Sequence, residues 1–293
     1  MKIVQMHNST DSQMMGYLLV TKQGRLIAVD GGTEGDTEAF VELVHHFGGY
    51  IDLWILTHPH SDHAGVFWNL VDAPVSIAVN CVCYSPAPAG FVAVEDSGRE
   101  DIPRFREAVK RCRYPVRILE AGDRFVWDQV EIEILRVADP GCRKDYVNNL
   151  SVVFKVTEKL QGSGKRHMAG GTEQAFFTMI FLGDLGWTQG DELLKCCGSR
   201  PGLLRADAVQ MAHHGQWGVE ENVYRAIGPR WCFWPTPDWL WTNTPRGETP
   251  GSGSWRTLET REWMEGLQAC SVTSLEEHVV FDTMDKTVRK LAL

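Results

Sequence analysis

The chain has 293 residues, and its 38 acidic and 29 basic side chains give a formal net charge of -9 at pH 7. A chain of this length buries roughly three quarters of its unfolded surface, so its core needs no disulfides. Hydrophobic residues make up 43% of the sequence and charged residues 23%, values that exclude wholesale disorder. The acidic charge disfavours nucleic acid as a partner, because neutralising phosphates needs clustered Lys and Arg.

Membrane and export signals are not found in the sequence. No apolar run approaches the ~20 residues that span a membrane, so we expect no membrane partner. Residues 1–8 lack the apolar stretch of a signal peptide, and we expect a cytoplasmic protein. The 8 cysteines form neither a paired CxxC zinc frame nor a compact disulfide ladder, so we expect reduced thiols.

Strand-like apolar segments alternate with helical segments along the whole chain. We expect strands at 17–20, 26–29, 51–56, 75–83, 116–119, 124–127, 130–137, 150–156, 176–182, 206–211 and 231–234. Apolar residues at helical spacing predict helices over 36–47, 64–70, 99–112 and 258–267. The Gly-rich stretch 161–171 is typical of a flexible hairpin loop. Two β-rich halves with interspersed helices favour one α/β sandwich over separate modules.

A dense cluster of ionisable side chains follows the apolar strand expected at 51–56. His58, His60, Asp62 and His63 come directly after this strand. A loop at a strand end lets such side chains converge, and imidazoles with a carboxylate make a divalent metal site. The alternative is a polar turn with accidental histidines, and the density of the cluster argues against it.

Two further candidates lie downstream in similar settings. Asp184 follows an apolar strand and Gly183; the alternative for a lone carboxylate here is helix capping or a plain turn. His213 and His214 also follow an apolar strand, and a His pair on a loop is often structural. Taken together, three strand-end clusters predict one site at one edge of a sandwich.

The cluster at residues 58–63 matches the HxHxDH motif, and the chain therefore resembles the metallo-β-lactamase superfamily over about residues 3 to 235. Asp184 fits the bridging carboxylate of that family, and His213-His214 fits its late metal-ligand motif. Within the superfamily, the chain looks most like the hydrolase domain of ComEC-like competence proteins and their free-standing relatives. The segments that carry this closer resemblance are Leu26-Ile27-Ala28-Val29-Asp30-Gly31-Gly32, Asn148-Asn149-Leu150-Ser151-Val152-Val153, Phe181-Leu182-Gly183-Asp184 and Ala206-Asp207-Ala208-Val209-Gln210-Met211-Ala212-His213-His214-Gly215.

The resemblance implies an αββα four-layer sandwich, a single domain over residues 1–293, and a site for two divalent metal ions. Zinc is the first choice of metal, with manganese or iron as alternatives. The implied ligands are His58 and His60 for one ion, Asp62, His63 and His214 for the other, and Asp184 between them.

The resemblance also implies how the site works. A hydroxide that bridges the two metals attacks the substrate, and the metals stabilise the charge that develops. Asp62, Asp184 and His213 are the catalytic candidates, with His213 as a contact for the substrate or leaving group. Asp30 either orients a metal-bound histidine or simply ends a strand.

The sequence departs from the family pattern at two places. Many members supply a third histidine to the first metal, but His167 is the only histidine between residues 64 and 183. The family position falls near Asn148-Asn149, so we expect the first metal to be weakly held, bound by more oxygen ligands, or absent on purification, and manganese is then an alternative to zinc. Residues 5–13 also differ from the Gly-rich acidic opening of competence relatives, so DNA is not carried over as the substrate.

The predicted function is a metallo-hydrolase that acts on a small-molecule or short phosphoester, with a phosphodiester first, because two metals clamp the attacking and leaving oxygens. The alternatives are a lactone, β-lactam or thioester hydrolase, and a non-hydrolytic metal-binding protein with a redox or sensing role. The late aromatic residues Trp231, Phe233, Trp234, Trp239 and Trp241 are expected to pack in the core, with a wall over the substrate as the alternative.

Overall fold

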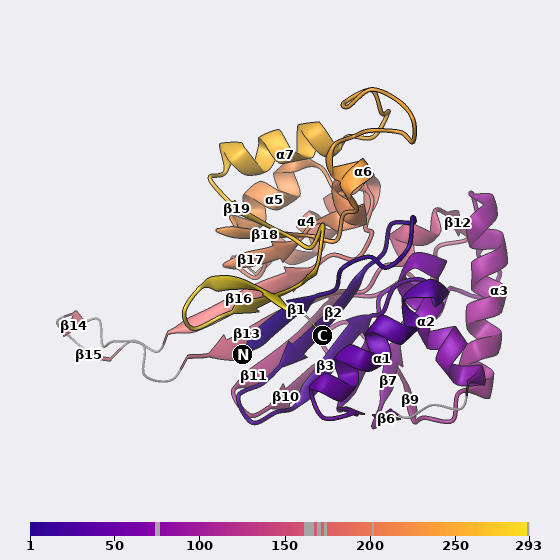
Figure 1. Ribbon diagram of the computed structural model, residues 1–293, viewed down its shortest axis with the longest axis horizontal. Helices are drawn as coiled ribbons and strands as arrows, with labels where there is room; N and C mark the ends of the chain where they lie inside the picture. Colours follow the sequence, from indigo (N-terminus) through magenta and orange to yellow (C-terminus); the bar gives the residue numbers. More distant parts are fainter. Residues whose placement is uncertain (74–76, 161–166, 169–170, 173–174, 201, 292) are drawn as a thin grey trace.

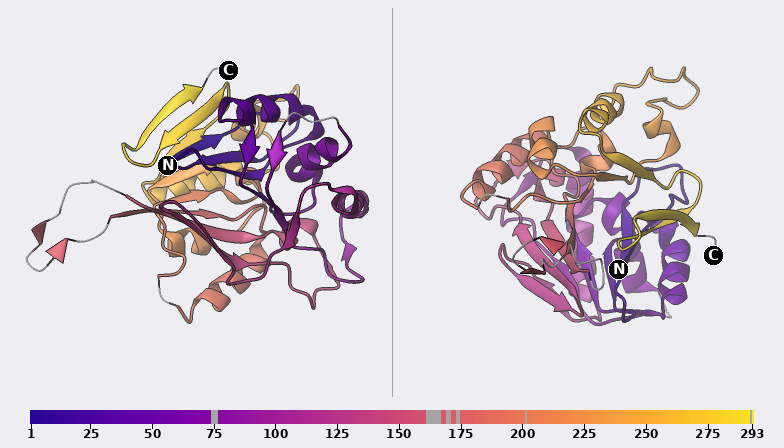
Figure 2. Two further views of the ribbon diagram at one scale, coloured as in Figure 1. Left: turned by 90° about the horizontal axis from the view of Figure 1, so that it is seen from below. Right: turned by 90° about the vertical axis from the view of Figure 1, so that its left-hand side faces the viewer.

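The computed structural model describes residues 1–73, 77–160, 167–168, 171–172, 175–200, 202–291 and 293 (Figure 1). Two large β-sheets pack face to face, and helices cover the outer face of each sheet (Figures 1 and 2). The predicted αββα four-layer sandwich is therefore confirmed. Among the described residues, no helix combines the length and the apolar character that crossing a membrane needs.

The first sheet has eight strands, and its half nearest the site is parallel. Its antiparallel part joins the first strands of the chain to a C-terminal hairpin, and β3, β5, β7 and β9 then run parallel to one another. In spatial order the strands are β21 (Thr287–Leu291), β20 (His278–Asp282), β1 (Lys2–Gln5), β2 (Gly16–Val20), β3 (Leu26–Asp30), β5 (Leu53–Leu56), β7 (Val82–Tyr84) and β9 (Val116–Ile118).

The second sheet has seven strands and is again antiparallel at one side and parallel at the other. The strands from β10 to β16 pair antiparallel, and those from β16 to β19 pair parallel. In spatial order they are β10 (Arg124–Trp127), β11 (Val130–Arg136), β13 (Val153–Lys159), β16 (Phe176–Phe181), β17 (Ala208–Gln210), β18 (Trp231–Trp234) and β19 (Cys270–Thr273).

Amphipathic helices close both outer faces because each sheet has apolar side chains on its outer side as well. Side chains of α1 (Thr37–His46), α2 (Ser61–Asp72) and α3 (Asp96–Arg111) pack against the first sheet. Side chains of α4 (Trp187–Cys197), α5 (Glu221–Ile227) and α7 (Thr257–Gly266) pack against the second. The short helix α6 (Asp238–Trp241) lies beside α7 (Figure 1).

The remaining elements are short. They are β4 (Tyr50–Ile51), β6 (Ala78–Val79), β8 (Val92–Ala93), β12 (Lys144–Asp145), β14 (His167–Met168), β15 (Gly171–Thr172) and the 3-10 turns η1 (Glu34–Asp36), η2 (Val147–Leu150) and η3 (Ala212–Gly215).

The central core lies between the two sheets. Phe181 stacks on Phe154 with ring centroids 4.8 Å apart, and Tyr17 from the opposite sheet meets the same ring edge-on at 5.3 Å. All three side chains are fully buried, and each burial of this kind contributes about 1.5–3 kcal/mol. The two sheets are thus held together by one continuous apolar layer. All 8 cysteines are free, as predicted.

The expected elements differ from the observed ones at several places. The helix expected from residue 64 begins at Ser61, because His60 already has an extended backbone that can start it. The strand expected at 150–156 begins only at Val153, after η2. The strand expected at 75–83 is divided into β6 and β7, and residues 74–76 lie outside the described residues. Of the predicted Gly-rich loop, residues 161–166 and 169–170 also lie outside the described residues.

The topology brings strand ends to one edge of the sandwich. β3 and β5 run parallel. β3 ends at Asp30, and β5 ends at Leu56, just before the HxHxDH segment. β16 and β17 run parallel in the other sheet and end before Asp184 and His213. Ligands far apart in sequence can therefore meet where these carboxyl ends approach each other across the core.

Close backbone packing at Gly65 holds the first turn of α2 against the segment after β3. The amide of Gly31 donates to the carbonyl of His63 (3.1 Å), and the amide of Val66 donates to the carbonyl of Gly32 (3.1 Å). A Cβ at Gly65 would lie 2.6 Å from the backbone nitrogen of Glu34, which has no room to move away.

We expect Gly65→Ala to lower the free energy of unfolding by about 1–3 kcal/mol, because the added methyl group forces the helix away from this backbone. Gly266→Ala is the control, since a Cβ there meets no atom within 4 Å, and it should change stability by less than about 0.5 kcal/mol. Chemical denaturation measures both. Equal stability of the two variants would contradict the packing argument.

Candidate metal centre

The HxHxDH segment is positioned by a strand end and a helix start. His58 follows β5, His60 is the N-cap of α2, and Asp62 and His63 lie in its first turn. A carboxylate is favourable in the first turn of a helix because the helix dipole is positive there. The end of a strand and the first turn of a helix thus position the four side chains that the sequence analysis predicted as ligands.

Asp30 orients the histidine at the centre of the site. Its Oδ1 accepts the amide of Thr57 (2.7 Å), and its Oδ2 accepts the hydroxyl of Thr57 (2.6 Å) and Nδ1–H of His63 (2.7 Å). All three side chains are buried. Because Nδ1 of His63 carries the donated proton, its Nε2 is a bare nitrogen. Asp30 therefore acts through His63, which is the first of the two roles expected for it.

The two late histidines lie in a strained turn. His213 and His214 in η3 have φ angles of 51° and 54°, a left-handed conformation that is uncommon outside glycine. Nδ1–H of His214 donates to the carbonyl of Pro235 (2.7 Å), so its Nε2 is also bare. Nδ1–H of His213 donates to the carbonyl of Trp217 (3.2 Å). Each ring is thus held by a backbone carbonyl that accepts its only proton.

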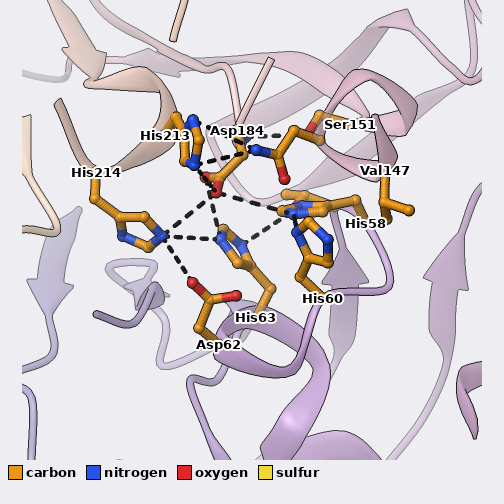
Figure 3. Close-up of polar contacts among 12 residues, drawn as sticks. His58, His60, Asp62, His63, Val147, Ser151, Asp184, His213 and His214 are labelled. Carbon is orange, nitrogen blue, oxygen red and sulfur yellow. Dashed lines mark hydrogen bonds and ion pairs between the residues drawn. The ribbon is translucent and has the colours of Figure 1, made fainter. Parts of the chain in front are cut away.

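The predicted residues from all three clusters converge (Figure 3). Oδ1 of Asp184 lies 3.1 Å from Nε2 of His63, and its Oδ2 lies 3.4 Å from Nε2 of His214. Oδ2 of Asp62 lies 3.2 Å from Nε2 of His214. Oδ2 of Asp184 is 3.9 Å from the Nε2 atoms of both His58 and His213.

A cation fits between Asp62, His63, Asp184 and His214. Their ligand atoms lie within 4.8 Å of one another, and the bare Nε2 atoms of His63 and His214 face each other at 3.3 Å. Both carboxylate oxygens of Asp184 are buried without a hydrogen-bond partner, although imidazoles surround them. Facing lone pairs and orphaned oxygens are unfavourable unless a cation lies between them. We name this group the Asp62–His214 position.

A second pair of bare nitrogens lies beside it. The hydroxyl proton of Thr57 goes to Asp30, so Nδ1–H of His58 donates to Oγ1 of Thr57 (3.1 Å). Nε2–H of His60 donates to Oε1 of Glu95 (3.2 Å). Nε2 of His58 and Nδ1 of His60 then face each other as lone pairs at 3.2 Å. We name this group the His58–His60 position.

Burial and neighbouring charges shift the pKa values of the clustered carboxylates and histidines in different directions. Burial would raise the pKa of Asp62 and Asp184, but the neighbouring histidines outweigh it and hold both well below their usual range. Burial lowers the pKa of His214, but Asp184 and Asp62 raise it to about 9. Burial also lowers the pKa of His58 and His213. Both carboxylates are thus ionised, as metal ligation requires.

Glu95 was missed by sequence analysis. Besides the proton of His60, Oε1 of Glu95 accepts the amide of Val147 (2.7 Å), which ties the N-terminus of α3 to η2. Its place before a predicted helix was the one signal that could have found it.

Gln13 and Gln216 were missed as well. Gln13 donates from Nε2 to Oδ2 of Asp62 (3.0 Å), and Gln216 donates to Oε1 of Gln13 (2.6 Å). The local sequence holds no signal for a glutamine that meets a predicted metal ligand only in the folded chain.

The two asparagines near the missing third histidine differ. Asn149 uses both ends of its amide, donating to Asp145 (2.7 Å) and accepting the amide of Gly186 (3.0 Å). Asn148 donates from Nδ2 to the bare Nε2 of His213 (3.1 Å), and its Oδ1 is buried without a partner. Asn148 therefore has a free oxygen beside the site, and Asn149 does not.

The late aromatic residues divide between core and site. Trp234 and Phe233 are fully buried in the core, as expected. Trp239 instead lines a cavity of about 470 Å³ together with His60, Asp62 and His213. The interpretation as a wall near the site thus holds for one of these residues.

The chain is similar to known proteins in part of its sequence and in its fold. Residues 16–142 match the family model of the metallo-beta-lactamase superfamily. The chain is similar to the metallo-beta-lactamase fold protein YhfI from Bacillus subtilis, at 11% identity and a TM-score of 0.54, with 96% of this chain and 100% of that chain covered. It is also similar to the E377D mutant of CmlA β-hydroxylase, at 11% identity and a TM-score of 0.52, with 96% of this chain and 53% of that chain covered.

The family match over residues 16–142 bears out the predicted resemblance to the metallo-beta-lactamase superfamily, and the similar solved structures share the fold. No curated protein matches the sequence. The closer resemblance to ComEC-like hydrolase domains is not tested by these comparisons and stays a prediction.

Removing metal from the centre should make stability depend on pH. In the metal-free protein, Nε2 of His214 takes up a proton in place of a metal. Against the lowering effect of burial, the carboxylates of Asp184 and Asp62 raise the pKa of His214 to about 9, compared with 6.5 for a free histidine. This proton therefore stabilises the metal-free fold fully below pH 6.5, and the stabilisation is lost as the pH rises through 9. We expect the melting temperature of the chelated protein to fall between these pH values. Thermal unfolding with a chelator measures it. His214→Gln should flatten the slope, and an equal slope in both proteins would contradict the assignment.

Proposed function

We propose that this chain is a metal-dependent hydrolase that holds two divalent ions on either side of Asp184. One observation carries the proposal. Bare imidazole nitrogens face each other in two pairs, at 3.2 and 3.3 Å, next to a carboxylate whose oxygens are both buried without a hydrogen-bond donor. Without cations, these largely buried groups repel one another.

The two positions divide the predicted ligands. His58 and His60 hold one ion, Asp62, His63 and His214 hold the other, and Asp184 reaches both. Zinc is the first choice of metal, because the site is rich in imidazole ligands, which zinc prefers. Manganese and iron are the alternatives.

Asn148 supplies the further ligand that the missing histidine leaves open. His213 accepts from Nδ2 of Asn148, which fixes the orientation of the amide and leaves Oδ1 free. Asn148 lines the same cavity as His60, and the resemblance places the missing ligand at the first metal, so we assign this oxygen to the His58–His60 position. An amide oxygen in place of a nitrogen makes this position the harder of the two, which favours manganese there.

The protein residues prepare the site for hydrolysis. When bound, two divalent ions lower the pKa of a water molecule towards neutrality and stabilise negative charge on the attacked centre. Asp30 and Glu95 keep the protons of His63 and His60 on the side away from the ions. His213 stays neutral because burial lowers its pKa, so it contacts the leaving group without carrying charge.

The substrate is a small ester with at most one negative charge, and a phosphodiester comes first. The cavities that reach His213 and Asn148 have no Lys or Arg among their described lining residues, whereas Glu95 and Asp101 line the nearer one. A polyanion would meet these carboxylates without a counter-charge, so nucleic acid remains disfavoured. Neutral lactones, β-lactams and thioesters fit the same charges and are the second candidates.

Asp184→Asn tests the central ligand. We expect the variant to lose bound metal and to hydrolyse bis(4-nitrophenyl) phosphate ~100-fold or more slowly, because several kcal/mol of charge stabilisation disappear. Metal is counted by mass spectrometry, and hydrolysis is followed by absorbance. Asp207→Asn is the matched control, since its carboxylate accepts from Thr178 at the far end of the strands. A wild-type protein that holds metal but hydrolyses no phosphodiester, phosphomonoester or lactone would refute the proposal.

Asn148→Ala tests the open ligand position. We expect the weaker of the two metal affinities to fall about tenfold or more, while the other stays unchanged. Calorimetric titration of the metal-free protein with Mn²⁺ and Zn²⁺ resolves the two events. Asn148→His should restore the weaker affinity and shift its preference towards zinc. Two unchanged affinities in Asn148→Ala would show that Asn148 is not a ligand.

A further inference from the structure

Three large aromatic side chains surround a cavity next to the metal centre. Tyr146, Trp187 and Trp217 are 52%, 50% and 42% exposed, whereas Trp54 and Trp234 are fully buried. Their cavity has a volume of about 560 Å³, within the range of small-molecule sites. Exposed indole rings that line one hollow are unfavourable in water, so a ligand that covers them gains apolar contact.

The backbone that carries the metal centre also places these rings. Tyr146 comes two residues before Asn148, Trp187 begins α4 three residues after Asp184, and Trp217 comes three residues after His214. Each ring therefore lies within three residues of one of the residues at the metal centre. Trp217 is also tied directly, because its carbonyl accepts the proton of His213.

The aromatic cavity is continuous with the cavity over the metal ligands. Tyr146, Asn148 and His213 line both, and the second cavity reaches His60 and Asp62. A substrate that spans them has its scissile group beside the metals and its other end between the rings.

The polar groups of the aromatic cavity leave no place for a charged end. Among the described residues, its lining contains no Lys or Arg, and Arg256, which lies 5.8 Å from the centre of the Trp217 ring, is already paired with Glu220 and Glu259. Asp145 already accepts hydrogen bonds from Tyr146, Asn149 and Gln189. An anionic group here would lose its hydration without a counter-charge, and this cost selects an uncharged occupant.

We propose that the cavity formed by Tyr146, Trp187 and Trp217 binds an uncharged aromatic ring on the leaving or retained side of the substrate. The inference rests on the proposed hydrolase function and names its substrate class: a small, singly charged or neutral ester that carries an aryl group or a nucleobase. An indole ring can stack on the face of any aryl group or nucleobase, so this contact does not select one particular ring.

The test uses singly charged phosphonate monoesters that differ in this group, and the ligand is checked to be intact after each titration. Benzyl methylphosphonate and propyl methylphosphonate are titrated into the metal-loaded protein, and binding is followed by calorimetry and by quenching of tryptophan fluorescence. We expect the benzyl ligand to bind about tenfold more tightly, in line with the stacking energies of aromatic rings on proteins. Thymidine 5′-methylphosphonate identifies the ring: binding tighter than the benzyl ligand indicates a nucleobase, and weaker binding, still above propyl, indicates an aryl group.

Variants locate the effect. Trp187→Ala and Trp217→Ala should abolish the preference for the aromatic ligand, and Trp187→Phe should keep most of it. Phe176→Ala is the control, because Phe176 is 47% exposed at the opposite end of β16 and should leave the preference unchanged. Metal content is measured for each variant, so that a lost metal is not mistaken for a lost ring contact.

The outcomes separate this inference from the proposed function. Equal affinity for the benzyl and propyl ligands, or a preference that survives Trp187→Ala and Trp217→Ala, overturns the aromatic site even if the protein hydrolyses phosphodiesters. A protein that hydrolyses no ester but prefers the benzyl ligand through these tryptophans retains the site and loses the hydrolase proposal.

Discussion

The candidate metal centre depends on the fold holding groups that repel one another, lone-pair nitrogens and carboxylate oxygens, close together in a largely buried site. Bare nitrogens of His58, His60, His63 and His214 lie near one another, and Asp184 lies among them without a hydrogen-bond donor. Such an arrangement is unfavourable by itself, because buried polar atoms need partners. The fold therefore has to supply enough packing and hydrogen bonding elsewhere to keep these side chains in place until cations bind.

That support comes from groups outside the centre. Asp30, Glu95, the hydroxyl of Thr57 and the carbonyl of Pro235 take one ring proton each, so four imidazoles present the nitrogen that a metal needs. A histidine held in this way cannot exchange its tautomer without breaking a buried hydrogen bond. The positive φ angles of His213 and His214 belong to the same device, since strain at this turn aims the two rings in different directions.

The open side of the centre has a different character from its buried side. Charge is concentrated around Asp62 and Asp184, whereas Trp187 and Trp217 present apolar surface a few residues further along the same segments. Binding and chemistry are therefore placed side by side by the same strand ends. The superfamily fold brings ligands to one edge, and the loops that follow them decide what the edge can accept.

The local pattern of the sequence predicted one α/β sandwich with a site at its edge, and the resemblance to the metallo-β-lactamase superfamily supplied the four-layer arrangement and the predicted ligand set. The HxHxDH spacing, Asp184 and the late histidine pair each follow an apolar strand, and parallel strand ends must share an edge. The structure brings these predicted residues together. The start of α2 and of β13 was displaced by three residues, because the short-range pattern does not reveal where capping or a 3-10 turn ends an element.

Contacts between segments far apart in the chain could not be predicted from the local sequence pattern. Only tertiary structure distinguishes Asn148, with a free oxygen, from Asn149, whose amide is used at both ends. Only tertiary structure brings Gln13 to Asp62, or gathers Tyr146, Trp187 and Trp217 around one hollow. The sequence by itself determined which residue types could bind metal and the order of the strands that carry them. Which atoms face the centre was decided by packing between segments far apart in the chain, for which local periodicity has no signal.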